Sequence, residues 1–158
     1  METTYLLPNR YKRIGWLFLI PAILIGIPTV IYSWEPELFN VSVVGIFNSG
    51  IGETSEIIGI QDNNFFNELV GIVLITSGLI VAFSKERDED EFISSIRLSS
   101  LVWATYWNYA ILLMALILVY DLTFYWIMLF NMFTILVLFI VKFNWSIWRS
   151  RKLIGYEE

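Results

Sequence analysis

The ten Lys and Arg residues of this 158-residue chain fall into three short segments, and the regions between those segments contain none. The segments cover residues 10–13, 85–97 and 142–152. The intervening loops carry only acids, such as Glu68 and Asp121. Cytoplasmic loops of membrane proteins are enriched in Lys and Arg, whereas the opposite side is depleted of them. The pattern therefore predicts a membrane protein with both termini in the cytoplasm.

Four long runs without charge separate these basic and acidic segments. A helix of roughly 20 residues crosses about 30 Å of hydrocarbon. The uncharged runs are 14–34, 69–84, 98–120 and 122–141. The spans are expected at residues 14–34, 66–84, 98–120 and 122–142, with Glu68 and Lys142 as boundary residues, an outer loop at 35–65 and a cytoplasmic loop at 85–97. Because Asp121 alone separates the last two spans, they are expected to form a tight hairpin. The predicted fold is all-α, a single transmembrane domain (1–158) built as a four-helix bundle with the N- and C-termini inside.

The composition excludes most kinds of catalytic and metal site. The chain is 57% hydrophobic and 17% aromatic, with 16% charged residues and neither His nor Cys. Thiol catalysis, imidazole acid–base chemistry and ordinary zinc sites need those two residue types. No cofactor, catalytic residue or metal site is predicted, and no basic, aromatic-rich patch suggests nucleic-acid binding. The one enzymatic alternative is a magnesium-dependent lipid-modifying activity that would use carboxylates such as Asp88 and Asp90.

The cytoplasmic loop carries a dense run of charges before the third span. Asp88 followed by Glu91 predicts a capping box at the start of a helix that extends into the cytoplasm before Leu98. The simpler interpretation is a solvated, well-capped helix start. The functional interpretation is a docking surface for a cytoplasmic partner, formed by Asp88, Glu89, Asp90, Glu91 and Arg97.

A second polar group is expected within the membrane. Asn108 and Asn131 lie at similar distances from Asp121, near the middle of the third and fourth spans. The other polar residues at this depth are Thr76, Ser77 and Thr134. Amides and hydroxyls that bond between helices stabilise a bundle by roughly 0.6–2 kcal/mol each. The layer is therefore interpreted first as a contact between helices and second as a polar site for a small solute.

Three segments resemble those of small four-helix membrane proteins of the Bacteroidota. They are Ser84–Tyr109 (SKERDEDEFISSIRLSSLVWATYWNY), Leu6–Lys12 before the first span, and Phe130–Phe133 in the fourth. The group has no assigned activity, so the resemblance implies a four-helix fold and carries over no catalytic residue. The acidic segment before a membrane helix is also similar to that of small membrane proteins encoded beside helix-turn-helix regulators. That likeness implies a partner on the cytoplasmic side.

Together these features predict a non-catalytic accessory or regulatory protein of the inner membrane. It would act by binding another membrane or cytoplasmic protein, or by self-association, within the lipid bilayer. The alternative is a homo-oligomeric pore or facilitator for a small solute, built around the polar layer in the middle of the membrane.

Overall fold

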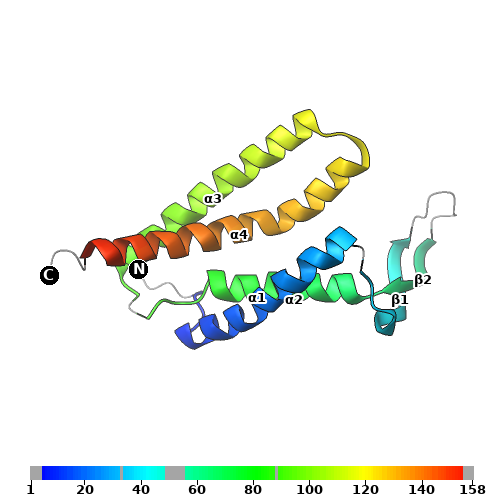
Figure 1. The fold of residues 1–158 in the computed structure, drawn as a ribbon, viewed down its shortest axis with the longest axis horizontal. Helices are drawn as coiled ribbons and strands as arrows, with labels where there is room; N and C mark the ends of the chain where they lie inside the picture. Colours follow the sequence, from blue (N-terminus) through cyan, green and yellow to red (C-terminus); the bar gives the residue numbers. More distant parts are fainter. Residues whose placement is uncertain (1–4, 33, 49–55, 88, 155–158) are drawn as a thin grey trace. The chain divides into compact units, whose positions relative to one another are not determined.

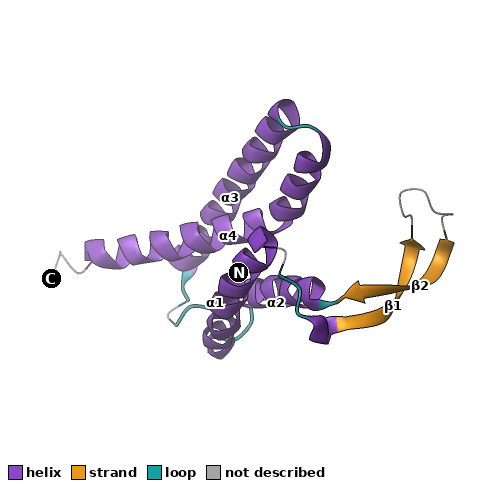
Figure 2. Cartoon of the chain, turned by 45° about the vertical axis from the view of Figure 1, so that its right-hand side comes forward, coloured by secondary structure: helices purple, strands orange, loops and turns teal. Residues whose placement is uncertain are grey.

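The computed structural model describes residues 5–32, 34–48, 56–87 and 89–154, and these are mostly helical (Figures 1 and 2). The elements are, in order, α1 (Asn9–Tyr32), the 3-10 turn η1 (Glu37–Phe39), β1 (Asn40–Asn48), β2 (Glu56–Asn64), α2 (Phe66–Ala82), α3 (Glu91–Leu118) and α4 (Asp121–Ile154). The four α-helices occupy the four predicted apolar runs. The two strands lie in the predicted outer loop, for which no regular structure was predicted.

Three of the described helices, α1, α3 and α4, are long and apolar enough to cross a membrane. The fourth, α2, is apolar but shorter, since its 17 residues rise only about 25 Å. A helix of about 17 residues is at the lower limit for a bilayer span. These helices indicate a membrane protein.

The helix α3 begins earlier than the apolar run that predicted it. Its N-cap is Asp90, whose carboxylate accepts a hydrogen bond from the Ile93 backbone N–H at 2.7 Å. The predicted capping box, with Asp88 as N-cap and Glu91 at its third position, is therefore wrong, because Glu91 is the first helical residue. Asp88 itself lies outside the described residues. The start at Glu91 gives α3 about two turns before Leu98.

The chain folds as two compact units. One, the bundle unit, comprises Met1–Leu19 and Leu74–Glu158, and the other, the hairpin unit, comprises Ile20–Val73. In the bundle unit, α3 and α4 pack against each other and are joined by Val119 and Tyr120 (Figure 1). Asp121 has a φ of 61°, a left-handed conformation that Asp tolerates better than most residues and that begins α4 sharply after the turn.

Two contacts fix the direction and depth of the α3–α4 pair. Arg97 lies against Phe143, and Asn108 bonds Asn131, so the two helices run antiparallel. The largest fully buried apolar side chains are Phe139, Phe143 and Val81. Phe143 and Val81 come from α4 and α2, so the core of the bundle unit lies near the end at which α2 ends and α3 begins.

The hairpin unit contains a two-stranded antiparallel sheet in which Asn40 pairs with Asn64 and Val44 with Ile60 (Figure 2). The amide of Asn64 donates to the Pro36 carbonyl at 2.9 Å and to the Asn40 side chain at 2.7 Å, and its oxygen accepts from the Phe66 N–H. One residue thus connects the sheet to the start of α2.

Candidate functional site

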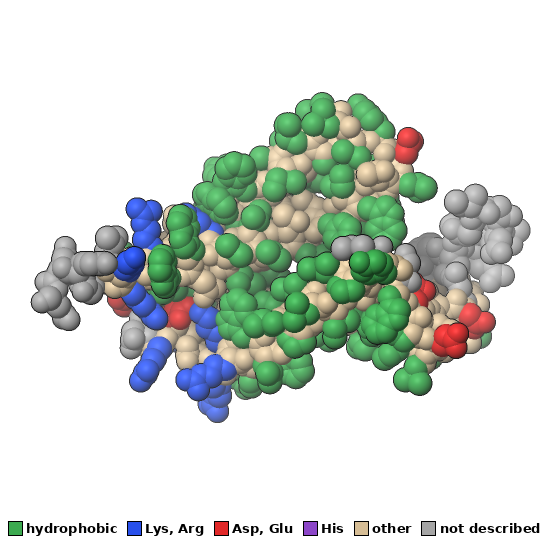
Figure 3. All heavy atoms as spheres, viewed as in Figure 1, with side chains coloured by type: hydrophobic (Ala, Val, Ile, Leu, Met, Phe, Trp, Pro, Cys, Tyr) green, Lys and Arg blue, Asp and Glu red, His purple; other side chains and the backbone are tan. Residues whose placement is uncertain are grey.

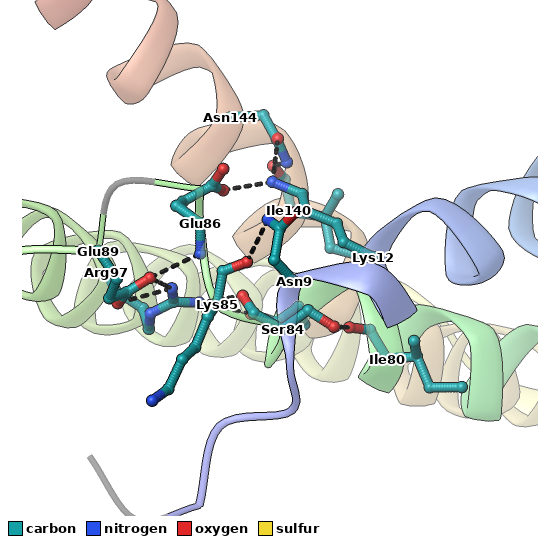
Figure 4. A network of polar contacts seen from close by, with 11 residues as sticks. Asn9, Lys12, Ile80, Ser84, Lys85, Glu86, Glu89, Arg97, Ile140 and Asn144 are labelled. Carbon is teal, nitrogen blue, oxygen red and sulfur yellow. Dashed lines mark hydrogen bonds and ion pairs between the residues drawn. The ribbon is translucent and has the colours of Figure 1, made fainter. Parts of the chain in front are cut away.

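The most extensive polar contacts among the described residues form a cluster where α2 ends and α3 begins (Figure 4). We define this polar cluster as Asn9, Lys12, Ser84, Glu86, Glu89, Arg97 and Asn144. All seven belong to the bundle unit. They come from α1, from the α2–α3 connection, from α3 and from α4, and Ser84 and Arg97 also donate to backbone carbonyls of α2.

Arg97 is the central residue of the cluster. Its Nη2 donates to both carboxylate oxygens of Glu89, at 3.0 and 2.8 Å. Its Nη1 donates to the backbone carbonyls of Ala82, at 3.0 Å, and Ser84, at 3.4 Å. Hydrogen bonds between a guanidinium and a carboxylate are charge-assisted, and they are stronger than those between neutral groups. Arg97 is buried, although it carries a permanent positive charge.

The contacts of Arg97 also complete the end of α2. The last four carbonyls of an α-helix have no partner within the helix, and they carry the negative end of its dipole. α2 ends at Ala82, so the guanidinium supplies hydrogen-bond donors and positive charge at this position. The guanidinium also stacks over the Phe143 ring at 4.5 Å from the ring centroid. Arg97 therefore acts as a cap that α3 provides to α2.

A second ion pair connects α1 to the same loop. Lys12 binds the Glu86 carboxylate and donates to the Asn144 side-chain oxygen at 3.3 Å. The Glu86 backbone N–H donates to Glu89 at 2.7 Å, which links the two ion pairs into one network (Figure 4). The N-terminal segment is attached separately, because Leu7 pairs with the backbone of residues 83–85 and Asn9 donates to the Lys85 carbonyl at 2.7 Å.

The structure gives the predicted docking residues different environments. Glu89 and Arg97 bind each other inside the cluster, Asp90 caps α3 while remaining exposed, and Glu91 is exposed. A partner could reach Glu91 and Asp90, but not the buried guanidinium of Arg97. Sequence reasoning missed Lys12, Glu86 and Asn144. For Lys12 and Glu86 the one signal was their opposite charge in two segments that were both expected on the basic side, and Asn144 carried no signal.

The predicted polar layer is assembled only in part. Asn108 is buried, and its amide exchanges two hydrogen bonds with Asn131, at 3.4 and 3.2 Å. Ser77 is buried with its hydroxyl toward the Leu74 carbonyl, and the Thr134 hydroxyl donates to the Phe130 carbonyl. Thr76 is exposed. The arrangement joins α3 to α4 by a reciprocal amide pair, as expected of a contact between helices.

A different surface is exposed on the hairpin unit. Val44, Ile58 and Ile60 share one face of the two-stranded sheet, because Val44 pairs with Ile60 and the next residue pair on that face includes Ile58. All three side chains are more than two-thirds exposed. A two-stranded hairpin with an apolar face is marginally stable in water without something to pack against. We call Val44, Ile58 and Ile60 the hairpin face.

The described residues contain no group of three or more acidic, His or Cys side chains that could hold a metal ion. In the polar cluster, the carboxylates of Glu86 and Glu89 form ion pairs with Lys12 and Arg97. Its side chains bind one another. Comparisons of the chain with known protein families, with curated proteins and with solved structures find no match.

Proposed function

We propose that the protein is a non-catalytic accessory or regulatory protein of the inner membrane that acts by binding another protein. The observation that carries this proposal is the hairpin face, an exposed apolar patch on a sheet of only two strands. Unpaired strand edges and exposed apolar patches are typical of surfaces that bind a partner. The charged loop supports the same interpretation, because Glu86 and Glu89 are paired with Lys12 and Arg97 of this chain and so are less available to a partner.

The proposed topology has four spans with both termini in the cytoplasm and with α3 and α4 as a hairpin through the bilayer. The distribution of Lys and Arg supports it. The exposure of most large apolar side chains on α3 and α4 supports it as well, because lipid would cover them (Figure 3). In this topology the hairpin face lies outside the cytoplasm, while Asp90, Glu91 and the neighbouring Phe92 form a second exposed surface inside it.

The experiment is affinity purification of the tagged protein from its own membranes in mild detergent, with mass spectrometry of the proteins that accompany it. A variant with Val44→Thr and Ile60→Thr changes the hairpin face, and a variant with Glu91→Lys and Phe92→Ser changes the cytoplasmic surface. Threonine keeps a strand preference, so the first variant should retain the sheet while losing apolar area. We expect a stoichiometric partner that the hairpin variant loses and the cytoplasmic variant retains.

Loss of the partner in the cytoplasmic variant alone would move the docking surface to the start of α3. A monomer that binds nothing from its native membrane would contradict the proposal. A homo-oligomer without another protein would favour the alternative of a pore, whose test is solute flux in liposomes. The Asn108–Asn131 pair gives that alternative little support, because each amide already has the other as its partner.

A further inference from the structure

Lys142 is a cation at the end of the longest apolar run in α4. It follows 20 uncharged residues, Leu122–Val141, which rise about 30 Å and so match the hydrocarbon thickness of a bilayer. Lys142 therefore lies at the boundary between hydrocarbon and headgroups on the basic side. It is half-buried, in contrast to the exposed Arg149, Arg151 and Lys152 further along the helix.

Two indole rings hold the ammonium of Lys142. Its Nζ lies 5.3 Å from the ring centroid of Trp103 on α3 and 5.0 Å from that of Trp145 on α4. Further along α4, the Nζ of Lys152 lies 5.5 Å from the ring centroid of Trp148. Trp is enriched at the headgroup level of membranes because its ring is apolar at one end and polar at the other, and Lys is enriched on the cytoplasmic side.

Neither ring neutralises the ammonium. The ion pairs among the described residues are Lys12–Glu86 and Arg97–Glu89, and neither includes Lys142. Cation–π contacts are weak compared with the cost of removing an ammonium from water. A half-buried cation at a membrane boundary therefore needs an anion, and the anion present at this depth in every bilayer is the phosphate of a lipid headgroup.

The positions around Lys142 favour a lipid with net negative charge. Lys142, Trp145, Arg149 and Lys152 follow at spacings of three, four and three residues, so they share one face of α4. The face that carries Phe143 and Ile147, roughly opposite, is buried. This end of α4 therefore presents a stripe of cations and indoles to the membrane surface. Figure 3 shows Lys and Arg side chains gathered at one end of the molecule.

We propose that Lys142, between Trp103 and Trp145, binds the phosphate of an anionic phospholipid in the cytoplasmic leaflet, with Arg149 and Lys152 extending the site. A soluble acidic partner fits less well, because Lys142 lies at the hydrocarbon boundary. The proposal rests on insertion of α4 in a bilayer. Failure of insertion would appear separately, as release of the protein from membranes by alkaline carbonate.

Native mass spectrometry of the full chain in detergent tests the proposal. The protein is titrated with equal amounts of phosphatidylglycerol and phosphatidylcholine that carry the same acyl chains, and the ratio of the two in the first bound lipid is measured. The wild type should prefer phosphatidylglycerol, and Lys142→Gln should lower the ratio about fivefold, which is the contribution of one basic residue near an anionic surface. Lys142→Arg should retain the preference, which separates lost charge from lost folding.

Arg10→Gln is the matched control, because it removes one exposed cation from the same basic side at the start of α1. It should leave the lipid ratio within about twofold of the wild-type value, since a residue outside the site contributes only a screened charge. Excess inorganic phosphate should leave the complex intact, because a free anion lacks acyl chains. Equal binding of both lipids, an equal effect of Arg10→Gln and Lys142→Gln, or displacement by inorganic phosphate would each overturn the proposal.

Discussion

Replacing Arg97 with methionine tests whether the polar cluster stabilises the bundle unit. Of the two side chains in the ion pair, that of Arg97 is 10% exposed and that of Glu89 is 15% exposed. Removing one partner of a buried ion pair costs about 3–5 kcal/mol, because the other charge stays buried without its counter-ion. Glu89 keeps some contact with water and the hydrogen bond from the Glu86 N–H, so we expect the low end, about 3 kcal/mol.

A double-mutant cycle separates the lost pair from lost packing. Glu89→Gln keeps an acceptor for the Glu86 N–H but removes the charge that Arg97 leaves behind. The combined variant Arg97→Met/Glu89→Gln should therefore be more stable than Arg97→Met alone. The free energy of unfolding is measured by far-UV circular dichroism in mixed micelles with a rising fraction of sodium dodecyl sulfate. The wild type and all three variants are compared in the same micelles.

Arg149→Met is the control for this cycle, because Arg149 is an exposed arginine on α4 outside the polar cluster. Substitutions at such surface positions usually change stability by less than about 0.5 kcal/mol. The reasoning is refuted if Arg97→Met costs less than about 1 kcal/mol, which is within reach of ordinary substitutions. It is also refuted if the effects of the two single changes add to within about 0.5 kcal/mol, as effects of independent sites do.

Three more expectations follow from the geometry. Asn108→Leu should cost about 1–2 kcal/mol in the same unfolding assay, because the partner amide loses its bond, whereas Asn108→Leu/Asn131→Leu should recover part of that loss; a double variant as costly as both single changes together would argue against the pair. Gly15→Ala should cost about 1–3 kcal/mol, because an added Cβ would lie 3.1 Å from a backbone nitrogen of α2 that cannot move alone; unchanged stability would show that α1 can shift. The chain has no Cys, so Arg151→Cys and Glu37→Cys should react with a membrane-impermeant maleimide from opposite sides of the membrane, and reaction from one side would contradict the proposed topology.

Much of the helical structure follows from the apolar runs, because a run of about 20 uncharged residues has few other stable conformations in a bilayer. The helix ends follow less directly. α3 and α4 extend beyond the apolar runs at their basic ends, to Glu91 and Ile154, because polar residues can continue a helix in water. An apolar run therefore predicts the part of a helix that suits hydrocarbon, but it does not predict where the helix ends.

The strands of the hairpin unit were not predicted, although the signals were present. A turn-forming stretch at 48–52 separates two segments rich in Val and Ile. The apolar residues of the hairpin face alternate along β2, where Ile58 and Ile60 are two residues apart. No regular structure was predicted for the outer loop, because a two-stranded sheet needs a partner surface that a sequence does not display.

In the candidate site, contacts set by a short connection could be predicted from the sequence, whereas contacts between distant segments could not. The equal depth of Asn108 and Asn131 could be predicted from their distances to Asp121, because a hairpin places such residues side by side. The pairing of Lys12 with Glu86 could not, since those residues are separated by 74 positions and several residues of either charge were available on that side. Only the packing of α1 against the end of α2 selects this pair.

The length of α2 explains why the charged loop is used internally. At 17 residues, α2 is the shortest of the four described α-helices, and its last two residues, Val81 and Ala82, are buried. An unsatisfied carbonyl costs several kcal/mol in a medium without water. Arg97 reaches the carbonyls of Ala82 and Ser84 from the neighbouring helix, and Glu89 then neutralises the guanidinium. The end of α2 therefore buries a cation, and an acid from the loop pairs with that cation. The exposed residues beyond that pair, such as Asp90 and Glu91, are the ones that a partner could reach.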